Sequence, residues 1–85
     1  MLALDIRREY KSSMIARIEY EENRGVLSVL FVGGAVYDYY KVPLEVFREF
    51  ETIVNNAKAN IAFESIGHHF NERVKPYYKY KRVMG

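Results

Sequence analysis

The segment Val26–Val32 constrains the fold most, because its seven consecutive residues are nearly all apolar and mostly β-branched or aromatic. Such a run predicts a central β-strand that contacts other elements on both faces. The polar segment 21–25 ends in Gly25 and predicts a hairpin loop before that strand. Period-two alternation over Met14–Tyr20 predicts an antiparallel neighbour on the other side of the loop.

The residues after the central strand predict a third strand and then a helix. Gly33 and Gly34 suit a tight turn, since glycine tolerates positive φ angles. The tyrosine-rich segment Val36–Val42 follows as the third strand. At Pro43 the apolar spacing changes to steps of three and four residues, which predicts an amphipathic helix.

A second, shorter helix is predicted from Ser65, a good N-cap, to a stop before Pro76. Residues 58–64 are expected to connect the helices. The predicted fold is therefore α+β: a three-stranded antiparallel meander followed by two helices. The extended C-terminal tail from Tyr77 is expected to pack on the sheet.

The central strand leaves one apolar face to be explained. Helices that cover one face would leave uncovered either Val26, Leu30 and Val32, or Leu27, Val29 and Phe31. A soluble protein rarely exposes so many neighbouring apolar groups. The N-terminal segment, the tail or a second copy of the chain is expected to cover them.

The length and composition limit the classes of protein. A chain of 85 residues predicts one domain. The absence of cysteine excludes disulfides, thiolate metal sites and a cysteine nucleophile. No apolar run approaches the roughly 18 residues of a membrane span, and the charged start Met1–Ile6 does not suit a signal peptide. We therefore expect a cytoplasmic protein without a membrane partner.

The positive charge is concentrated at the C-terminal end. Residues 1–64 hold eight Lys or Arg and ten Asp or Glu, whereas residues 65–85 hold five basic residues and one acidic residue. The basic residues of this end are Arg73, Lys75, Lys79, Lys81 and Arg82. The pattern favours an anionic partner, although a solvated tail that maintains solubility would have the same composition.

Several short motifs occur in a characteristic order. They are Ser12-Ser13, Leu27-x-Val29-x-Phe31, Tyr37-Asp38-Tyr39, Val42-Pro43, Phe47, Ser65-x-Gly67-x-x-Phe70-Asn71, Tyr78-Lys79-Tyr80 and Arg82. Residues 12–82 thereby resemble the KTSC domain, found at the C-terminus of some lysyl-tRNA synthetases and as stand-alone bacterial or phage proteins. Residues 1–11 form an N-terminal extension outside the pattern, and residues 58–64 look longer than the family's link. The resemblance brings no established activity with it, and its synthetase context implies RNA binding.

Tyr37 and Tyr39 are the first candidate binding residues. Two residues apart on a strand, their rings point to the same face about 7 Å apart. Exposed aromatic rings in that arrangement stack with unpaired bases. The alternative is that both rings close the core or support the tail.

Ser65, Gly67 and His68 form a candidate anion site at the start of the second helix. Free N–H groups at a helix N-terminus bind phosphate or carboxylate, and Gly67 has no Cβ to obstruct them. The alternative is an N-cap with a glycine that allows close packing.

His68 and His69 do not predict a metal site. Neighbours on a helix point about 100° apart, so they cannot chelate one ion together. His68 instead shares a face with Glu72, and His69 shares one with Arg73. We expect no metal, no cofactor and no nucleophilic catalysis.

The tail Tyr77–Arg82 interleaves aromatic and cationic side chains, as single-strand binders do. A tail strand with tyrosines inward and lysines outward would have the same alternation. The sequence thus predicts a non-catalytic, RNA-binding module. The expected nucleic-acid-binding residues are Tyr37, Tyr39, Arg73, Lys75, Lys79, Lys81 and Arg82. The alternative is a protein-interaction or inhibitor module, acting through an apolar sheet face or as a homo-oligomer.

Overall fold

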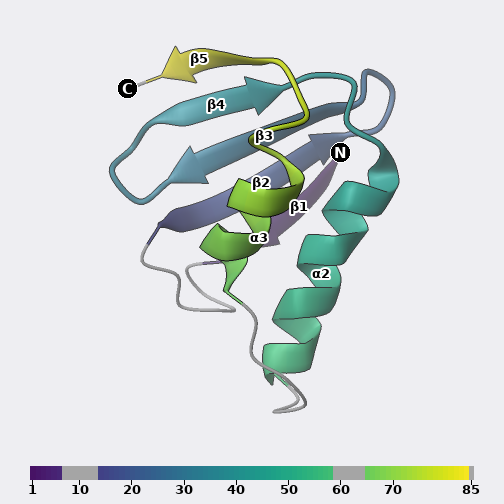
Figure 1. Cartoon of the computed structure of the whole chain (residues 1–85), viewed down its shortest axis with the longest axis vertical. Helices are drawn as coiled ribbons and strands as arrows, with labels where there is room; N and C mark the ends of the chain where they lie inside the picture. Colours follow the sequence, from purple (N-terminus) through teal and green to yellow (C-terminus); the bar gives the residue numbers. More distant parts are fainter. Residues whose placement is uncertain (7–13, 59–64, 85) are drawn as a thin grey trace.

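The computed structural model describes residues 1–6, 14–58 and 65–84. Within these residues the chain forms an antiparallel five-stranded sheet in the order β1-β2-β3-β4-β5, with two helices on one face (Figure 1). The strands are β1 (Leu2–Asp5), β2 (Ile15–Glu21), β3 (Val26–Phe31), β4 (Val36–Tyr39) and β5 (Tyr80–Met84), and the helices are α2 (Leu44–Lys58) and α3 (Ile66–Arg73). The predicted α+β class is confirmed.

The predicted number of strands is wrong, because both ends of the chain extend the sheet. Leu2 of β1 lies opposite Tyr20 of β2. At the other edge, Tyr80 of β5 lies opposite Tyr39 of β4. The tail therefore does not lie on the sheet but joins it through a backbone ladder, which satisfies main-chain groups on both strands. Each end strand has only four or five residues, too few for clear periodicity.

Glycines occupy the two hairpins where the backbone requires them. Gly25 has a φ of 63° between β2 and β3, and Gly34 has a φ of 100° between β3 and β4. The amide of Gly34 donates to the Phe31 carbonyl at 2.9 Å. Both predicted turns are confirmed.

The inner face of the sheet and the helices enclose the core. Leu27 and Val29 of β3 point inward and are fully buried. The rings of Tyr20 and Phe47 stack with centroids 5.9 Å apart, and the Tyr20 hydroxyl donates to the Val42 carbonyl at 2.6 Å. This hydrogen bond ties β2 to the segment that leads into α2.

The outer face of the sheet carries a mixture of polar and apolar side chains. Arg17 contacts the Glu19 carboxylate at 2.8 Å, and the Ser28 hydroxyl donates to Asp38 at 2.5 Å. The two end strands widen the sheet and do not lie across this face. The apolar face expected to need a cover is thus interrupted by polar rows, although Val32 stays 44% exposed. Among the described residues, no helix is long and apolar enough to cross a membrane.

Candidate nucleic-acid interface

Five aromatic rings form a closed circuit on the inner face, beside the β4–β5 edge. Each ring contacts the next, with centroids 5.4–5.6 Å apart. In order, the circuit is Phe31, Tyr37, Tyr80, Tyr39 and Phe70. The rings come from β3, β4, β5 and α3, so the sheet register and the position of α3 together create the circuit.

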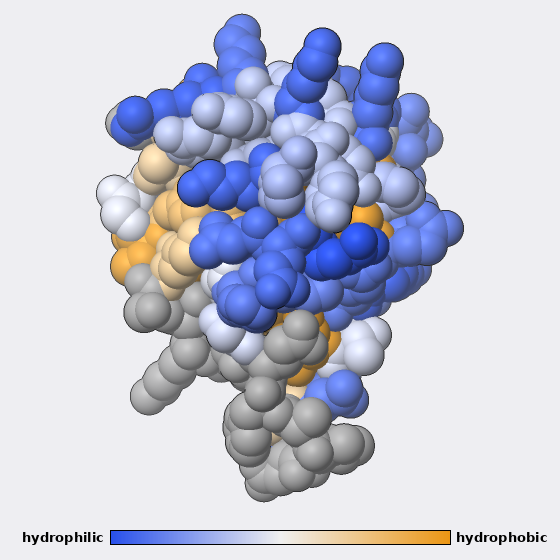
Figure 2. Space-filling view, viewed as in Figure 1, coloured by the Kyte–Doolittle hydropathy of each residue, from blue (hydrophilic) through white to orange (hydrophobic). Residues whose placement is uncertain are grey.

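The same rings line a cavity of about 370 Å³, which we call the aromatic cavity. Met14, Ala35 and Lys75 complete its lining. Figure 2 shows hydrophobic surface at the left of the view, near the β3–β4 turn, with hydrophilic side chains above it. The cavity lies within the range of about 300–1,000 Å³ that ligand sites occupy.

The two candidate tyrosines of β4 have different environments. Tyr39 is only 3% exposed, and its burial, followed by the charges of Tyr80 and Tyr37, raises its pKa to about 12. Tyr37 is half-buried, between Phe31 and Tyr80. Tyr80 is 57% exposed. Of these tyrosines, Tyr80 therefore offers a bound molecule the most ring surface, and Tyr39 forms the floor.

The candidate cations divide between the two faces of the sheet. Arg82 lies opposite Tyr37, with its guanidinium carbon 5.9 Å from the centre of that ring. Lys75 lines the aromatic cavity. Lys81 alternates with Arg82 and lies opposite Asp38, so it belongs to the outer face. In the part of the chain that the structure describes, no ion pair engages the side chain of Lys75, Lys79 or Lys81.

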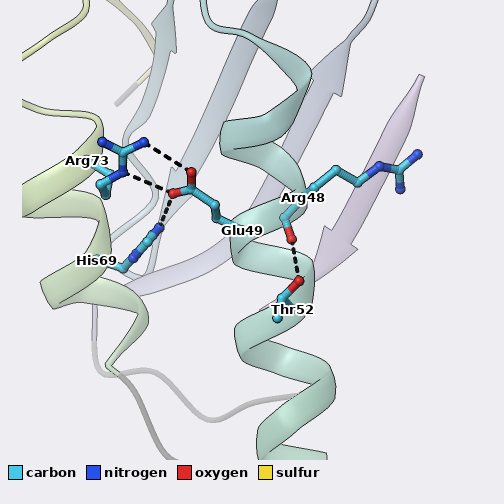
Figure 3. Close-up of polar contacts among 5 residues, drawn as sticks. All are labelled: Arg48, Glu49, Thr52, His69 and Arg73. Atoms are coloured by element: carbon cyan, nitrogen blue, oxygen red, sulfur yellow. Dashed lines mark hydrogen bonds and ion pairs between the residues drawn. The ribbon is translucent and has the colours of Figure 1, made fainter.

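Arg73 has a different environment, because it pairs with a carboxylate on the other helix. Its Nε donates to Glu49 Oε1 and its terminal nitrogen to Glu49 Oε2, both at 3.1 Å (Figure 3). His69 Nε2 lies 2.8 Å from Glu49 Oε1. The hydrogen bond from Arg73 is the main cause that lowers the Glu49 pKa, aided by His69 and opposed by burial. The three side chains thus join α2 to α3.

The neighbouring histidines separate as the helical spacing predicts. His68 contacts Glu72 at 2.8 Å on the exposed face, whereas His69 turns toward Glu49. Among the described residues, no group of three or more metal-ligating side chains could hold an ion.

The Ser65 and Gly67 candidates both have structural roles. The Ser65 hydroxyl accepts a hydrogen bond from the His68 amide at 3.1 Å, which makes Ser65 the predicted N-cap. Gly67 is buried, and a Cβ there would lie 2.9 Å from the Met14 sulfur. Glycine therefore lets α3 approach the residue before β2, and these contacts do not themselves indicate an anion site.

Sequence reasoning named Tyr80 only as part of the tail Tyr77–Arg82, and it missed Glu49 as the partner of Arg73. The alternation of Tyr78 and Tyr80 with lysines was the available signal for Tyr80. Only recognition of the tail as a strand paired with β4 would have placed Tyr80 beside Tyr37. Glu49 is 24 residues from Arg73, so no local spacing could have indicated their contact.

The fold and the aromatic cavity define a small α+β domain. Its strands β1 and β5 add to the two edges of an antiparallel meander. The sequence pattern of the KTSC domain matches residues 11–80. The chain belongs to the KTSC domain family. A crystal structure of a KTSC domain protein from Yersinia pestis superposes with a TM-score of 0.67 at 25% identity, covering 85% of this chain and 87% of that one.

Two relatives place the domain in different contexts. An uncharacterized protein of Stutzerimonas stutzeri (strain A1501) is 34% identical over 74 residues, covering 86% of this chain and 90% of that protein. A lysine–tRNA ligase of Nostoc punctiforme is 30% identical over 73 residues, covering 86% of this chain but only 11% of the ligase. The similarity to the ligase therefore concerns a small part of that enzyme.

Proposed function

We propose that this KTSC domain is a non-catalytic module that binds unpaired RNA in the aromatic cavity. The observation that carries the proposal is the closed circuit of five rings, with Tyr80 on its exposed side and Arg82 and Lys75 beside it. A base would stack on Tyr80, and the two cations would contact the neighbouring phosphates. Rings that stack with bases, next to cations that follow the backbone, are the general means of single-strand binding.

The charge balance supports a mode in which stacking dominates. The whole chain carries a net charge of only +2, and Arg73 already pairs with Glu49. Few cations are left for phosphate contacts, so general electrostatic affinity for duplexes is expected to be weak. Stacking on an aromatic side chain contributes about 1–3 kcal/mol per base and requires unpaired bases.

The related segment of a lysine–tRNA ligase supports RNA over DNA, because the name of that enzyme includes a tRNA substrate. A cytoplasmic location, expected from the sequence, belongs to the same proposal. The proposal assigns no reaction to the domain itself.

Fluorescence anisotropy with a labelled single-stranded RNA tests the proposal. Tyr80→Ala should weaken binding about 5- to 150-fold, the equivalent of one lost stacking interaction. Arg82→Gln should also weaken binding. Lys81→Gln is the matched control, because it removes the same charge from the adjacent residue on the outer face. Equal effects of the two charge variants, or no binding by the parent, would contradict the proposal.

Self-association or inhibition of another protein through the outer face is the second candidate, and it has less support. The ion pair of Arg17 with Glu19 and the Ser28–Asp38 hydrogen bond interrupt this face. Exposed Val32 is the feature that favours an interface there. Light scattering over a concentration series would reveal a dimer, and Val32→Glu should then dissociate it.

A further inference from the structure

A second cavity lies beside the start of β5 and also combines aromatic rings with cations. Its volume is about 400 Å³, and we call it the edge cavity. Five residues line it: Tyr40, Lys41, Tyr77, Tyr78 and Lys79. Three aromatic rings and two ammonium groups make up this lining, and none of the proposed contacts in the aromatic cavity uses them.

The two cavities share the same two backbone segments. Tyr39 lines the aromatic cavity and Tyr40 lines the edge cavity; Tyr80 and Lys79 divide in the same way. The Tyr40 amide donates to the Lys79 carbonyl at 2.9 Å, which fixes the two segments together. Tyr40 directly follows β4 and Lys79 directly precedes β5, so the edge cavity adjoins the aromatic cavity at the end of the β4–β5 ladder.

The turn after α3 supplies the remaining wall of the edge cavity. Tyr77 is 68% exposed, and its ring contacts that of Tyr78 with centroids 6.5 Å apart. Tyr78 in turn packs against the core. Tyr78 thus gives the cavity a fixed side, while Tyr77 presents a ring to the solvent.

Lys41 has a backbone conformation that ordinary side chains rarely adopt. Among the described residues, it is the only non-glycine residue with a positive φ, at 56°. Glycine adopts this conformation without the steric cost that a Cβ imposes. Conformations of this kind are enriched at binding sites, and here the side chain is a cation in an aromatic cavity.

We propose that the edge cavity is a second nucleotide subsite, so that one unpaired RNA strand crosses the β4–β5 edge and occupies both cavities. The inference rests on the proposed RNA binding and adds a second contact region to it. Lys41 and Lys79 would contact phosphate, and Tyr77 would stack with a base. A ligand that fills only one cavity, such as a free mononucleotide, would not use both sets of residues.

A competition experiment tests the inference. Unlabelled oligouridines of one, two, four and eight nucleotides compete with a labelled octamer in fluorescence anisotropy. The parent should bind the longer competitors more tightly than the mononucleotide. Lys41→Gly combined with Lys79→Gln should weaken octamer binding about fivefold or more, the sum of two exposed ion pairs. The affinity of the shortest competitor, held in the aromatic cavity, should stay within about twofold of the parent.

Lys41→Gly alone separates a binding role from a structural role. Glycine suits the positive φ, so the melting temperature should stay the same or rise, while octamer affinity falls. Lys58→Gln, which removes a positive charge at the end of α2, is the control and should change affinity little.

The outcomes separate the two proposals. Loss of binding with Tyr80→Ala but no effect of the Lys41 and Lys79 variants at any length would overturn the second subsite alone. Equal weakening of every competitor length by the Lys41 and Lys79 variants would also overturn it, because the residues of both cavities would then contact a single nucleotide. No effect of Tyr80→Ala would overturn the aromatic cavity as the RNA site.

Discussion

Glu49 of α2 accepts two hydrogen bonds from the Arg73 guanidinium of α3, each at 3.1 Å. The acceptors are the two different carboxylate oxygens, so the pair has the two-pronged geometry that arginine favours. His69 contacts the same carboxylate from the preceding turn of α3. Because the pair joins α2 to α3, its loss should weaken the packing of the two helices.

The first prediction concerns stability in acid. The pKa of Glu49 is lowered in the folded state, chiefly by Arg73. The ionised Glu49 carboxylate therefore contributes to the stability of the fold above the ordinary carboxyl pKa of 4.5. That contribution is lost as the pH falls through the lower folded pKa. Urea unfolding should therefore show Glu49→Gln less stable than the parent at pH 7 and nearly equal to it in strong acid.

Glu22→Gln is the control for this prediction, because Glu22 lies exposed in the β2–β3 hairpin. Its difference from the parent should be small at both pH values. A difference for Glu49→Gln that does not shrink in acid would mean that packing, and not the ion pair, is what the substitution removes.

The second prediction concerns the core. Phe47 is fully buried and stacks on Tyr20, so Phe47→Ala should lower the free energy of unfolding by about 3–5 kcal/mol. Val32→Ala, at an exposed position, should change it by less than about 0.5 kcal/mol. Urea denaturation of both variants measures the contrast. If Phe47→Ala lowered the free energy of unfolding as little as Val32→Ala, the surrounding core would have collapsed around the missing ring.

The third prediction concerns alkaline pH. Burial raises the Tyr39 pKa to about 12, so the folded state keeps its proton while the unfolded chain loses it near the ordinary value of 10. Stability should therefore be unaffected below pH 10 and should fall from there toward pH 12. Phenolate absorbance followed against pH should contain a late transition that Tyr39→Phe reduces, with the remainder from Tyr20, whose pKa burial also raises. Tyr37→Phe, which removes a half-buried hydroxyl, should leave that late transition in place.

The sequence was sufficient to predict the elements with strong periodicity. The run Val26–Val32 and the three- and four-residue spacing after Pro43 specify β3 and α2, because burial of an apolar face follows directly from such spacing. Ser65 and Gly34 were predicted for similar reasons, since caps and positive-φ turns require particular residue types. The KTSC resemblance was confirmed by the family match.

The two edge strands could not be predicted in the same way. Both strands are short: β1 is Leu2–Asp5 and β5 is Tyr80–Met84. The partner of β1 is distant in the sequence, and both helices lie between β5 and its partner β4. The closed ring circuit depends on that pairing, because it brings Tyr80 to Tyr37 and Tyr39. Sequence reasoning therefore placed the two β4 tyrosines on one face but did not place the ring of Tyr80 beside them.

The last prediction concerns the salt dependence of RNA binding. On single strands, each neutralised phosphate contributes about −0.7 to the slope of log affinity against log salt concentration. Contacts from Lys75 and Arg82, with Lys41 and Lys79 in the edge cavity, predict a slope of about −3 for an octamer. Arg82→Gln should reduce its magnitude by about 0.7, whereas Tyr80→Ala should lower affinity without changing the slope, because stacking releases no counterions. Anisotropy titrations at several salt concentrations measure both effects. A reduced slope in Lys81→Gln as well would extend the phosphate contacts to the outer face and contradict a path confined to the two cavities.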